Sequence, residues 1–181
     1  MTGVVLRIGC GWVALVLTVF GSVACSPTFN WRELRPQGTP LEALMPCKPE
    51  SASRPVPLLG SPVELHMHSC ETGGLTFAIA WAGLADAAQA SEALASWQAA
   101  SLAAIRVDPG DAAASGAWAV KVTGATHAQG VKARGSDHQG QPLQATMVYF
   151  EKGRRIYQAA IFGARIDDAV GTAFFEGLVL P

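Results

Sequence analysis

The chain has 181 residues, of which 50% are hydrophobic and 15% charged, and its formal net charge is −1 at pH 7. This length is enough for one domain with one modest core. Nucleic-acid-binding proteins show clustered Lys and Arg, which this composition does not resemble, so no nucleic-acid partner is expected.

The N-terminus has the order of an export signal. Arg7 precedes an apolar run over residues 8–21, and the small residues SVA come directly before Cys25. The apolar run is shorter than the roughly 20 residues that a membrane span needs. Residues 1–24 are therefore predicted to be a signal peptide that is removed on export. An uncleaved single-helix membrane anchor is the alternative.

Cys25 has two interpretations. The site resembles a bacterial lipobox, whose cysteine is lipidated and tethers the protein to a membrane, although lipoboxes usually carry Leu where this chain has Ser22. The alternative is an ordinary signal-peptidase site with a soluble product. Cleavage leaves Cys25, Cys47 and Cys70, and lipidation of Cys25 would leave an even pair for a disulfide in the oxidising envelope. We expect a periplasm-facing protein tethered to the membrane through Cys25.

The segment after the signal is expected to lead into strands. Residues 25–40 are polar with Pro and Gly and predict a tether, within which NWREL could form a first strand, and the domain is predicted at 41–181. Pro55 and Pro57 confine residues 53–59 to an edge or irregular strand. Strict alternation predicts strands over 63–70 and 75–81. On the first of these, the side chains expected to face the core are Val63, Leu65 and Met67.

The hydrophobic period then changes to that of a helix over residues 86–105. The predicted inward stripe contains Ala90, Leu94, Trp97, Ser101, Leu102 and Ile105. Because this segment carries few charges, we expect it to be largely covered by a sheet. Further strands are predicted at 117–124 and 130–137, a hairpin at 143–163 around Lys152-Gly153, and a short helix at 167–177. This order predicts an α+β fold: one antiparallel sheet with the long and the short helix beside each other on it.

The same order resembles a known type of protein. The segments that carry the likeness are LMPCKP, GGLTFAIAW, GQPLQATMVYFEKGRRIYQAAIFG and FFEGLVL. They resemble small proteobacterial envelope lipoproteins of the PsbP-like α/β-sandwich type, over roughly residues 41–181, and FNWRELRP resembles uncharacterised proteins of this kind. The resemblance implies the fold and an accessory or binding role, with no catalytic residues or cofactor to carry over. Cys47 departs from the pattern, which often has Gly at this position.

The stretch HMHSC places His66, His68 and Cys70 on one face of a strand. Imidazole and thiolate ligands suit zinc or copper, with a further ligand such as His127 or His138, so a periplasmic metal-binding protein using His66 and His68 is one hypothesis.

A disulfide is the competing hypothesis for Cys70. A hairpin turn centred between Leu58 and Leu59 would place Cys47 opposite Cys70, within disulfide reach. The oxidising location favours this pairing, so we predict the Cys47–Cys70 disulfide, no metal, and bystander roles for the histidines.

Catalytic patterns are weak. Ser136, Asp137 and His138 are consecutive and therefore cannot build a triad relay, so they are interpreted as turn residues. The charged residues of the 143–163 hairpin, Glu151, Lys152, Arg154 and Arg155, are expected to be solvated. We therefore expect a non-enzymatic envelope protein that binds or helps to assemble an unidentified envelope protein, without a cofactor.

Overall fold

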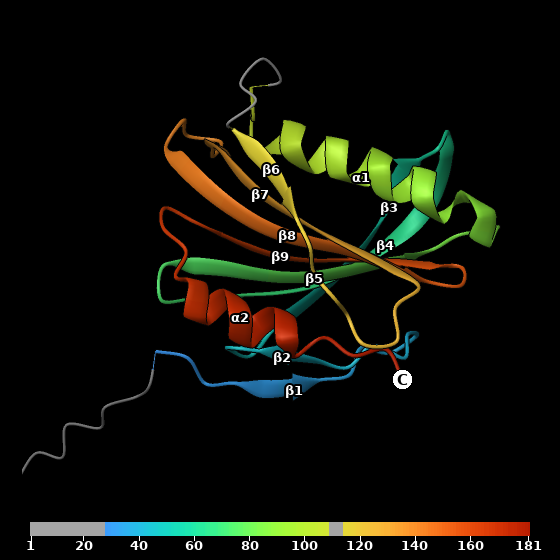
Figure 1. Ribbon diagram of the computed structural model, residues 1–181, viewed down its shortest axis with the longest axis horizontal. Coiled ribbons are helices and arrows are strands. Elements are labelled where there is room, and N and C mark those ends of the chain that lie inside the picture. Colours follow the sequence, from blue (N-terminus) through green and yellow to red (C-terminus); the bar gives the residue numbers. More distant parts are fainter. Residues whose placement is uncertain (1–27, 109–113) are drawn as a thin grey trace, which may run out of the picture.

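The computed structural model describes residues 28–108 and 114–181. The predicted signal peptide and Cys25 lie outside the described residues. A seven-stranded antiparallel sheet, in the spatial order β3-β4-β5-β9-β8-β7-β6, forms the middle layer of the molecule (Figure 1). The strands are β3 (Glu50–Leu58), β4 (Ser61–Thr72), β5 (Leu75–Gly83), β6 (Ser115–Trp118), β7 (His127–Ser136), β8 (Pro142–Lys152) and β9 (Arg155–Gly163). The predicted antiparallel α+β fold is confirmed at this level.

Two tight turns set the register of the hairpins. In the β8–β9 hairpin, Lys152 pairs with Arg155, and Gly153 takes the positive φ that a type II′ turn requires at its first central residue. This confirms the hairpin predicted around Lys152-Gly153. In the β3–β4 hairpin, Leu58 pairs with Ser61, and both central residues have positive φ, as in a type I′ turn.

The long helix packs on one face of the sheet. A short 3₁₀ turn, Ala87–Gln89, leads into α1 (Ala90–Ala104), and the Asp86 carboxylate caps the start by accepting from the Ala88 amide at 2.9 Å. The predicted inward stripe is confirmed, since its members are buried or half-buried. The opposite side of the helix is exposed, so the expectation that the helix would be largely covered is wrong: the sheet reaches only one side of it.

A polar cluster also holds α1 to the sheet. Gln158 of β9 donates its side-chain amide to the hydroxyls of Ser101 on α1, at 3.0 Å, and Tyr149 on β8, at 2.9 Å. Burial raises the pKa of Tyr149 above its usual value, so its phenol stays protonated at neutral pH.

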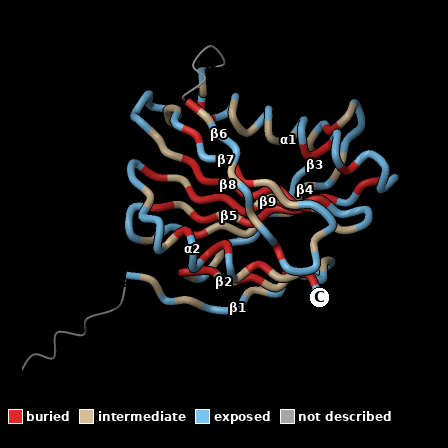
Figure 2. The backbone as a smooth tube through the Cα atoms, viewed as in Figure 1, coloured by how far each residue is buried: buried red, intermediate tan, exposed pale blue. Residues whose placement is uncertain are grey.

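The short helix α2 (Asp168–Glu176) lies on the face opposite α1, together with the small hairpin of β1 (Arg32–Leu34) and β2 (Ala43–Met45) (Figure 1). The expectation that the two helices lie beside each other is wrong. The reason is that β5, β8 and β9 are buried on both faces, as their colour in Figure 2 shows, so each face needs its own cover. Phe77 of β5 packs edge-on against Phe174 of α2, at 5.3 Å between ring centroids.

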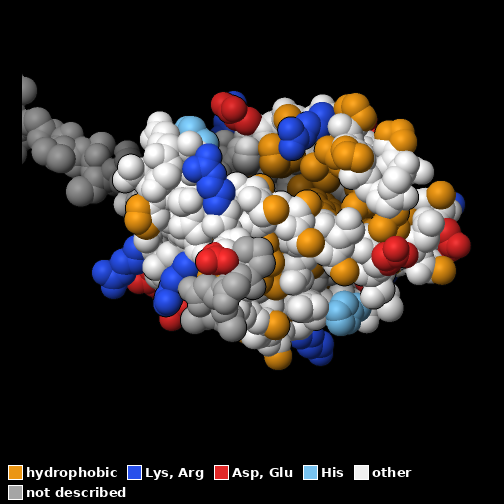
Figure 3. Space-filling view, turned by 90° about the horizontal axis from the view of Figure 1, so that it is seen from above, with side chains coloured by type: hydrophobic (Ala, Val, Ile, Leu, Met, Phe, Trp, Pro, Cys, Tyr) orange, Lys and Arg blue, Asp and Glu red, His pale blue; other side chains and the backbone are white. Residues whose placement is uncertain are grey.

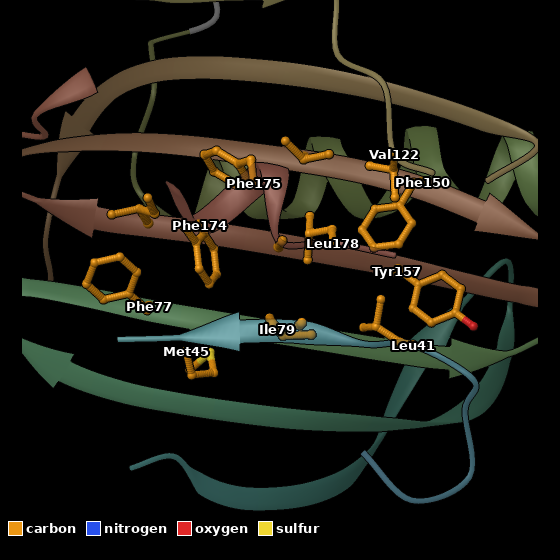
Figure 4. Packing of buried hydrophobic residues seen from close by; sticks show 14 of the residues in the cluster. Leu41, Met45, Phe77, Ile79, Val122, Phe150, Tyr157, Phe174, Phe175 and Leu178 are labelled. Carbon is orange, nitrogen blue, oxygen red and sulfur yellow. The ribbon is translucent and has the colours of Figure 1, made fainter. Parts of the chain in front are cut away.

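The core under α2 draws on distant parts of the chain. Met45 belongs to β2, and Leu41 lies just before it. Both side chains lie over Phe77 and Ile79 of β5 and near Tyr157 of β9 (Figure 4). The labelled set in that view also includes Val122, Phe150, Phe174, Phe175 and Leu178.

Part of the segment predicted as a tether belongs to this layer. Phe29 and Trp31 pack edge-on against Phe77, with ring centroids 6.2 and 6.4 Å apart. At the other end of the chain, Val179 forms bridges to Glu42 and Thr123. The N- and C-terminal described residues therefore both help to cover the sheet.

The predicted disulfide between Cys47 and Cys70 is present, with Cα atoms 5.9 Å apart. The register used to predict it is wrong. The turn is centred between Leu59 and Gly60, one residue later than expected, so Cys47 precedes β3 instead of lying in its ladder. The later turn is favoured because Gly60 accepts positive φ without steric cost. The bond therefore ties the loop before β3 to β4.

Replacing both Cys47 and Cys70 by alanine is expected to lower the free energy of unfolding by about 3 kcal/mol, because the bond restricts the unfolded chain. Urea unfolding of the oxidised protein measures this difference. A reductant should destabilise the unmodified protein and leave the double variant unchanged. Free thiols at both positions in protein isolated from the envelope would contradict the pairing.

Candidate functional site

The histidines of HMHSC lie on the same face as Cys70, as predicted, and each contacts a serine on the neighbouring strand. The Nδ1 atoms of His66 and His68 share hydrogen bonds of 2.8 Å with the hydroxyls of Ser53 and Ser51, which are their direct partners across β3 and β4. These bonds fix the orientation of both imidazole rings.

Both rings also stack on the indole of Trp81, the neighbour on β5. The ring centroids lie 4.8 Å away for His66 and 5.5 Å for His68, with interplanar angles of 20° and 7°. Trp81 is only 5% exposed, so the two imidazoles cover it. Burial lowers the pKa of His68 below its usual value of 6.5, and the nearby His66 lowers it further. The structure thus gives the pair a packing role.

The face of β4 that was expected to point into the core, with Val63, Leu65 and Met67, is only partly buried. Cys70 is 8% exposed, whereas Met67 is 37% exposed, the reverse of the expectation. Both faces of the sheet are covered, but α1 does not reach Met67, which lies near the β3 edge.

The other proposed metal ligands are not brought to His66 and His68. Cys70 is held in the disulfide, and His127 lies on the α1 face, where it lines a hollow with Tyr149. Among residues 28–108 and 114–181, no three side chains of His, Cys, Asp or Glu converge in an arrangement that could hold a metal ion.

The remaining polar residues singled out from the sequence have structural contacts. The Asp137 carboxylate accepts from the backbone amides of Gln139 and Gln141, both at 2.8 Å, so the interpretation of this segment as a turn is confirmed.

Two charged residues at the β8–β9 hairpin are not free in solvent, contrary to expectation. Lys152 donates to the Leu180 carbonyl at 3.2 Å, and the Oε2 atom of Glu151 is buried.

A hollow that the sequence analysis missed lies beside α2, and we call it the α2 pocket. Its volume is about 530 Å³. One wall is α2, and the other is the chain that leaves β6 after Trp118. Thr146 of β8 lies at the floor, and Lys132 of β7 lies at the rim. The remaining lining residues are Ala119, Val120, Lys121, Ile166, Asp167, Asp168, Gly171, Thr172, Phe175 and Glu176.

The lining combines aromatic walls with a few polar groups. The rings of Trp118 and Phe175 meet at 6.1 Å. The indole Nε1 of Trp118 is buried, and it has no hydrogen-bond partner among the described residues. The ring lies against Gly130, where a Cβ would come within 2.4 Å of this nitrogen, so only glycine lets the indole sit there.

An ion pair crosses the rim of the α2 pocket. The Nζ atom of Lys132 is 3.1 Å from Oδ1 of Asp168, and both side chains are well exposed. A second hollow of about 350 Å³ lies beside it and shares four lining residues with the first: Lys132, Thr146, Ile166 and Asp168. The ion pair therefore lies between two parts of one continuous trough.

Gly171 keeps the α2 pocket open. It is a helical residue facing the pocket, and a Cβ built there would meet only the ring of Phe175, at 4.0 Å. Glycine within a helix costs stability relative to alanine. This unfavourable choice in a helix is the one sequence signal that could have marked the pocket.

Comparison with known proteins does not identify this chain: no model of a protein family matches it, and no curated protein matches it. The PsbP-like resemblance therefore stays a prediction. Within the described part of the chain, no helix is both long and apolar enough to cross a membrane.

His68 should make stability depend on pH. Because its pKa is lower in the fold than in the unfolded chain, the unfolded state binds the proton more readily. The contribution of His68 to the free energy of unfolding is therefore present in full above pH 6.5, and it is lost as the pH falls from 6.5 through the lower pKa of the folded protein. Urea unfolding between pH 5 and 8 should show a smaller acid-side loss for His68→Gln than for the unmodified protein. His138→Gln, in the exposed turn, serves as the control, and an equal loss in all three proteins would contradict the prediction.

Proposed function

We propose that the protein is a cell-envelope lipoprotein whose domain binds an envelope partner instead of catalysing a reaction. The order of the N-terminal residues supports export and lipidation at Cys25. The disulfide supports an oxidising location, because such bonds persist outside the reducing cytosol.

The α2 pocket is the observation that carries the binding role. Ligand sites are typically concave and mostly apolar, with a small number of polar groups that orient the ligand. In the α2 pocket, Trp118 and Phe175 provide the apolar walls, while Lys132 and Asp168 offer one charge of each sign at the rim. An apolar side chain of a partner, flanked by polar groups, fits this combination.

Filling the α2 pocket tests the proposal. Gly171→Leu should place a side chain in the pocket and abolish binding, whereas Gly171→Ala should retain binding and stabilise the helix by about 1 kcal/mol. The mature protein and both variants are used as bait in a detergent extract of the envelope, and captured proteins are quantified by mass spectrometry. A partner should be retained by the unmodified and alanine baits and lost from the leucine bait. Equal recovery by all three folded baits would exclude the pocket as the binding site.

Processing at Cys25 is tested separately. Mass spectrometry of the mature N-terminus should find Cys25 as the first residue with an added lipid, and Cys25→Ala should release the protein from the membrane fraction. An unmodified Cys25 would indicate a secreted product, and an intact residue 1 would indicate an uncleaved anchor. Either result would overturn the lipoprotein assignment.

A further inference from the structure

The second hollow beside the α2 pocket has a polar floor. Its volume is about 350 Å³, and two directly paired positions of β7 and β8 form that floor: Lys132 opposite Thr146, and Arg134 opposite Gln144. Because directly paired residues share a face of the sheet, all four side chains lie on the side of α2. We call it the Arg134 hollow, and besides the start of β6 its lining includes Lys132, Arg134, Gln144, Thr146, Ile166 and Asp168.

Charge is distributed unevenly along the trough that the two hollows form. Lys132 and Asp168 line both hollows and pair with each other at 3.1 Å, so they add no net charge to either. The Arg134 hollow has one further charged lining residue, Arg134, which is exposed and forms no ion pair with another described residue. The further charged lining residues of the α2 pocket are Lys121, Asp167 and Glu176. The trough is therefore negative at the α2 pocket and positive at the Arg134 hollow.

Thr146 supplies an unpaired hydroxyl inside the hollow. Its side chain is only 8% exposed, and the hydroxyl forms no hydrogen bond with another described residue. A buried polar group without a partner costs stability, so this hydroxyl points to a ligand atom that completes its hydrogen bond. Gln144 offers a second donor, because its Oε1 atom accepts from the Ile166 amide at 3.2 Å and its NH₂ group remains available. Two neutral donors beside an unpaired guanidinium suit a carboxylate.

The face that carries α1 lacks such a separation of charge. Seen from above in Figure 3, acidic and basic side chains are interspersed over its described part. Charge therefore favours a ligand of one sign at the Arg134 hollow and does not do so on that face.

We propose that the Arg134 hollow binds a carboxylate of the same partner segment whose apolar side chain enters the α2 pocket. Lys132 borders the α2 pocket, and Arg134 lies two residues further along β7, a distance of about 7 Å. An extended peptide covers this distance in two residues and presents both side chains on one side. The partner segment is thus an extended peptide with Asp or Glu two positions from its apolar residue. This inference rests on the proposed binding at the α2 pocket and adds the chemistry of the partner.

Selection from a library of random displayed peptides tests the proposal, with the mature protein as bait. Enriched peptides should share an apolar residue with Asp or Glu two positions away. Arg134→Glu should retain the apolar preference and replace the acidic preference by Lys or Arg. Arg154→Glu, at the β8–β9 turn, makes the same change in net charge and should leave both preferences unchanged. Gly171→Leu, which fills the α2 pocket, should lose the apolar preference.

The affinity of one selected peptide, measured by fluorescence polarisation, locates its carboxylate. Arg134→Gln should weaken binding about fivefold, as expected for an exposed charged contact. Thr146→Val should weaken it about tenfold through the lost hydrogen bond to a charged group. A peptide with the amide in place of its acidic residue should bind the unmodified protein and Arg134→Gln equally. Thermal unfolding should show no loss of stability in Thr146→Val, because valine is close in size and removes an unpaired hydroxyl.

The outcomes separate this inference from the proposed function. An apolar preference that Gly171→Leu removes, without an acidic preference, would overturn the carboxylate site and leave the α2 pocket as a binding site. An acidic preference that Arg134→Glu and Arg154→Glu both retain would also overturn it, because the carboxylate would then bind elsewhere. Enrichment that Gly171→Leu does not change, or no enrichment by any folded bait, would overturn both proposals.

Discussion

The structure depends on the need to cover both faces of its central strands. β8 and β9 carry large apolar side chains in both of their alternating sets, as Phe150 and Tyr149 on β8 illustrate, and both of these are fully buried. β5 is also apolar on both faces, with large side chains toward α2 and alanines toward α1. A single layer of helices cannot keep two faces from water. The chain therefore places α1 on one side and assembles the other cover from α2, the β1–β2 hairpin and the last residues.

Because this cover is assembled from distant segments, the first and last described residues both contribute to the core. Phe29 and Trp31 pack on Phe77, and Val179 joins Glu42 to Thr123. The Cys47–Cys70 bond then fixes the path from this cover into the sheet, at the point where the chain passes from β2 to β3. The histidines of β4 complete the cover near the edge, because their rings shield Trp81.

The α2 pocket arises where this covering is incomplete. Gly171 of α2 faces this pocket and leaves space that a large side chain would fill. The apolar walls of the pocket stay within reach of a ligand, and the nearby Lys132–Asp168 ion pair offers a contact for a polar part of that ligand.

The sequence by itself determined the elements whose signal is local. Strict alternation in VELHMHSC and LTFAIAW, the helical period after Asp86, and Gly153 in a two-residue turn each depend on neighbouring residues, and each predicted element is present. The cysteine pair was also found, because the predicted export signal and the number of cysteines restrict the choices, even though the assumed register was shifted. Only the tertiary structure decided which face each helix covers, because residues 75–83 are apolar on both sides and favour neither. It also decided the roles of His66 and His68, which depend on Trp81 in the next strand, and the α2 pocket, since a cavity is set by the distance between elements that periodicity does not encode.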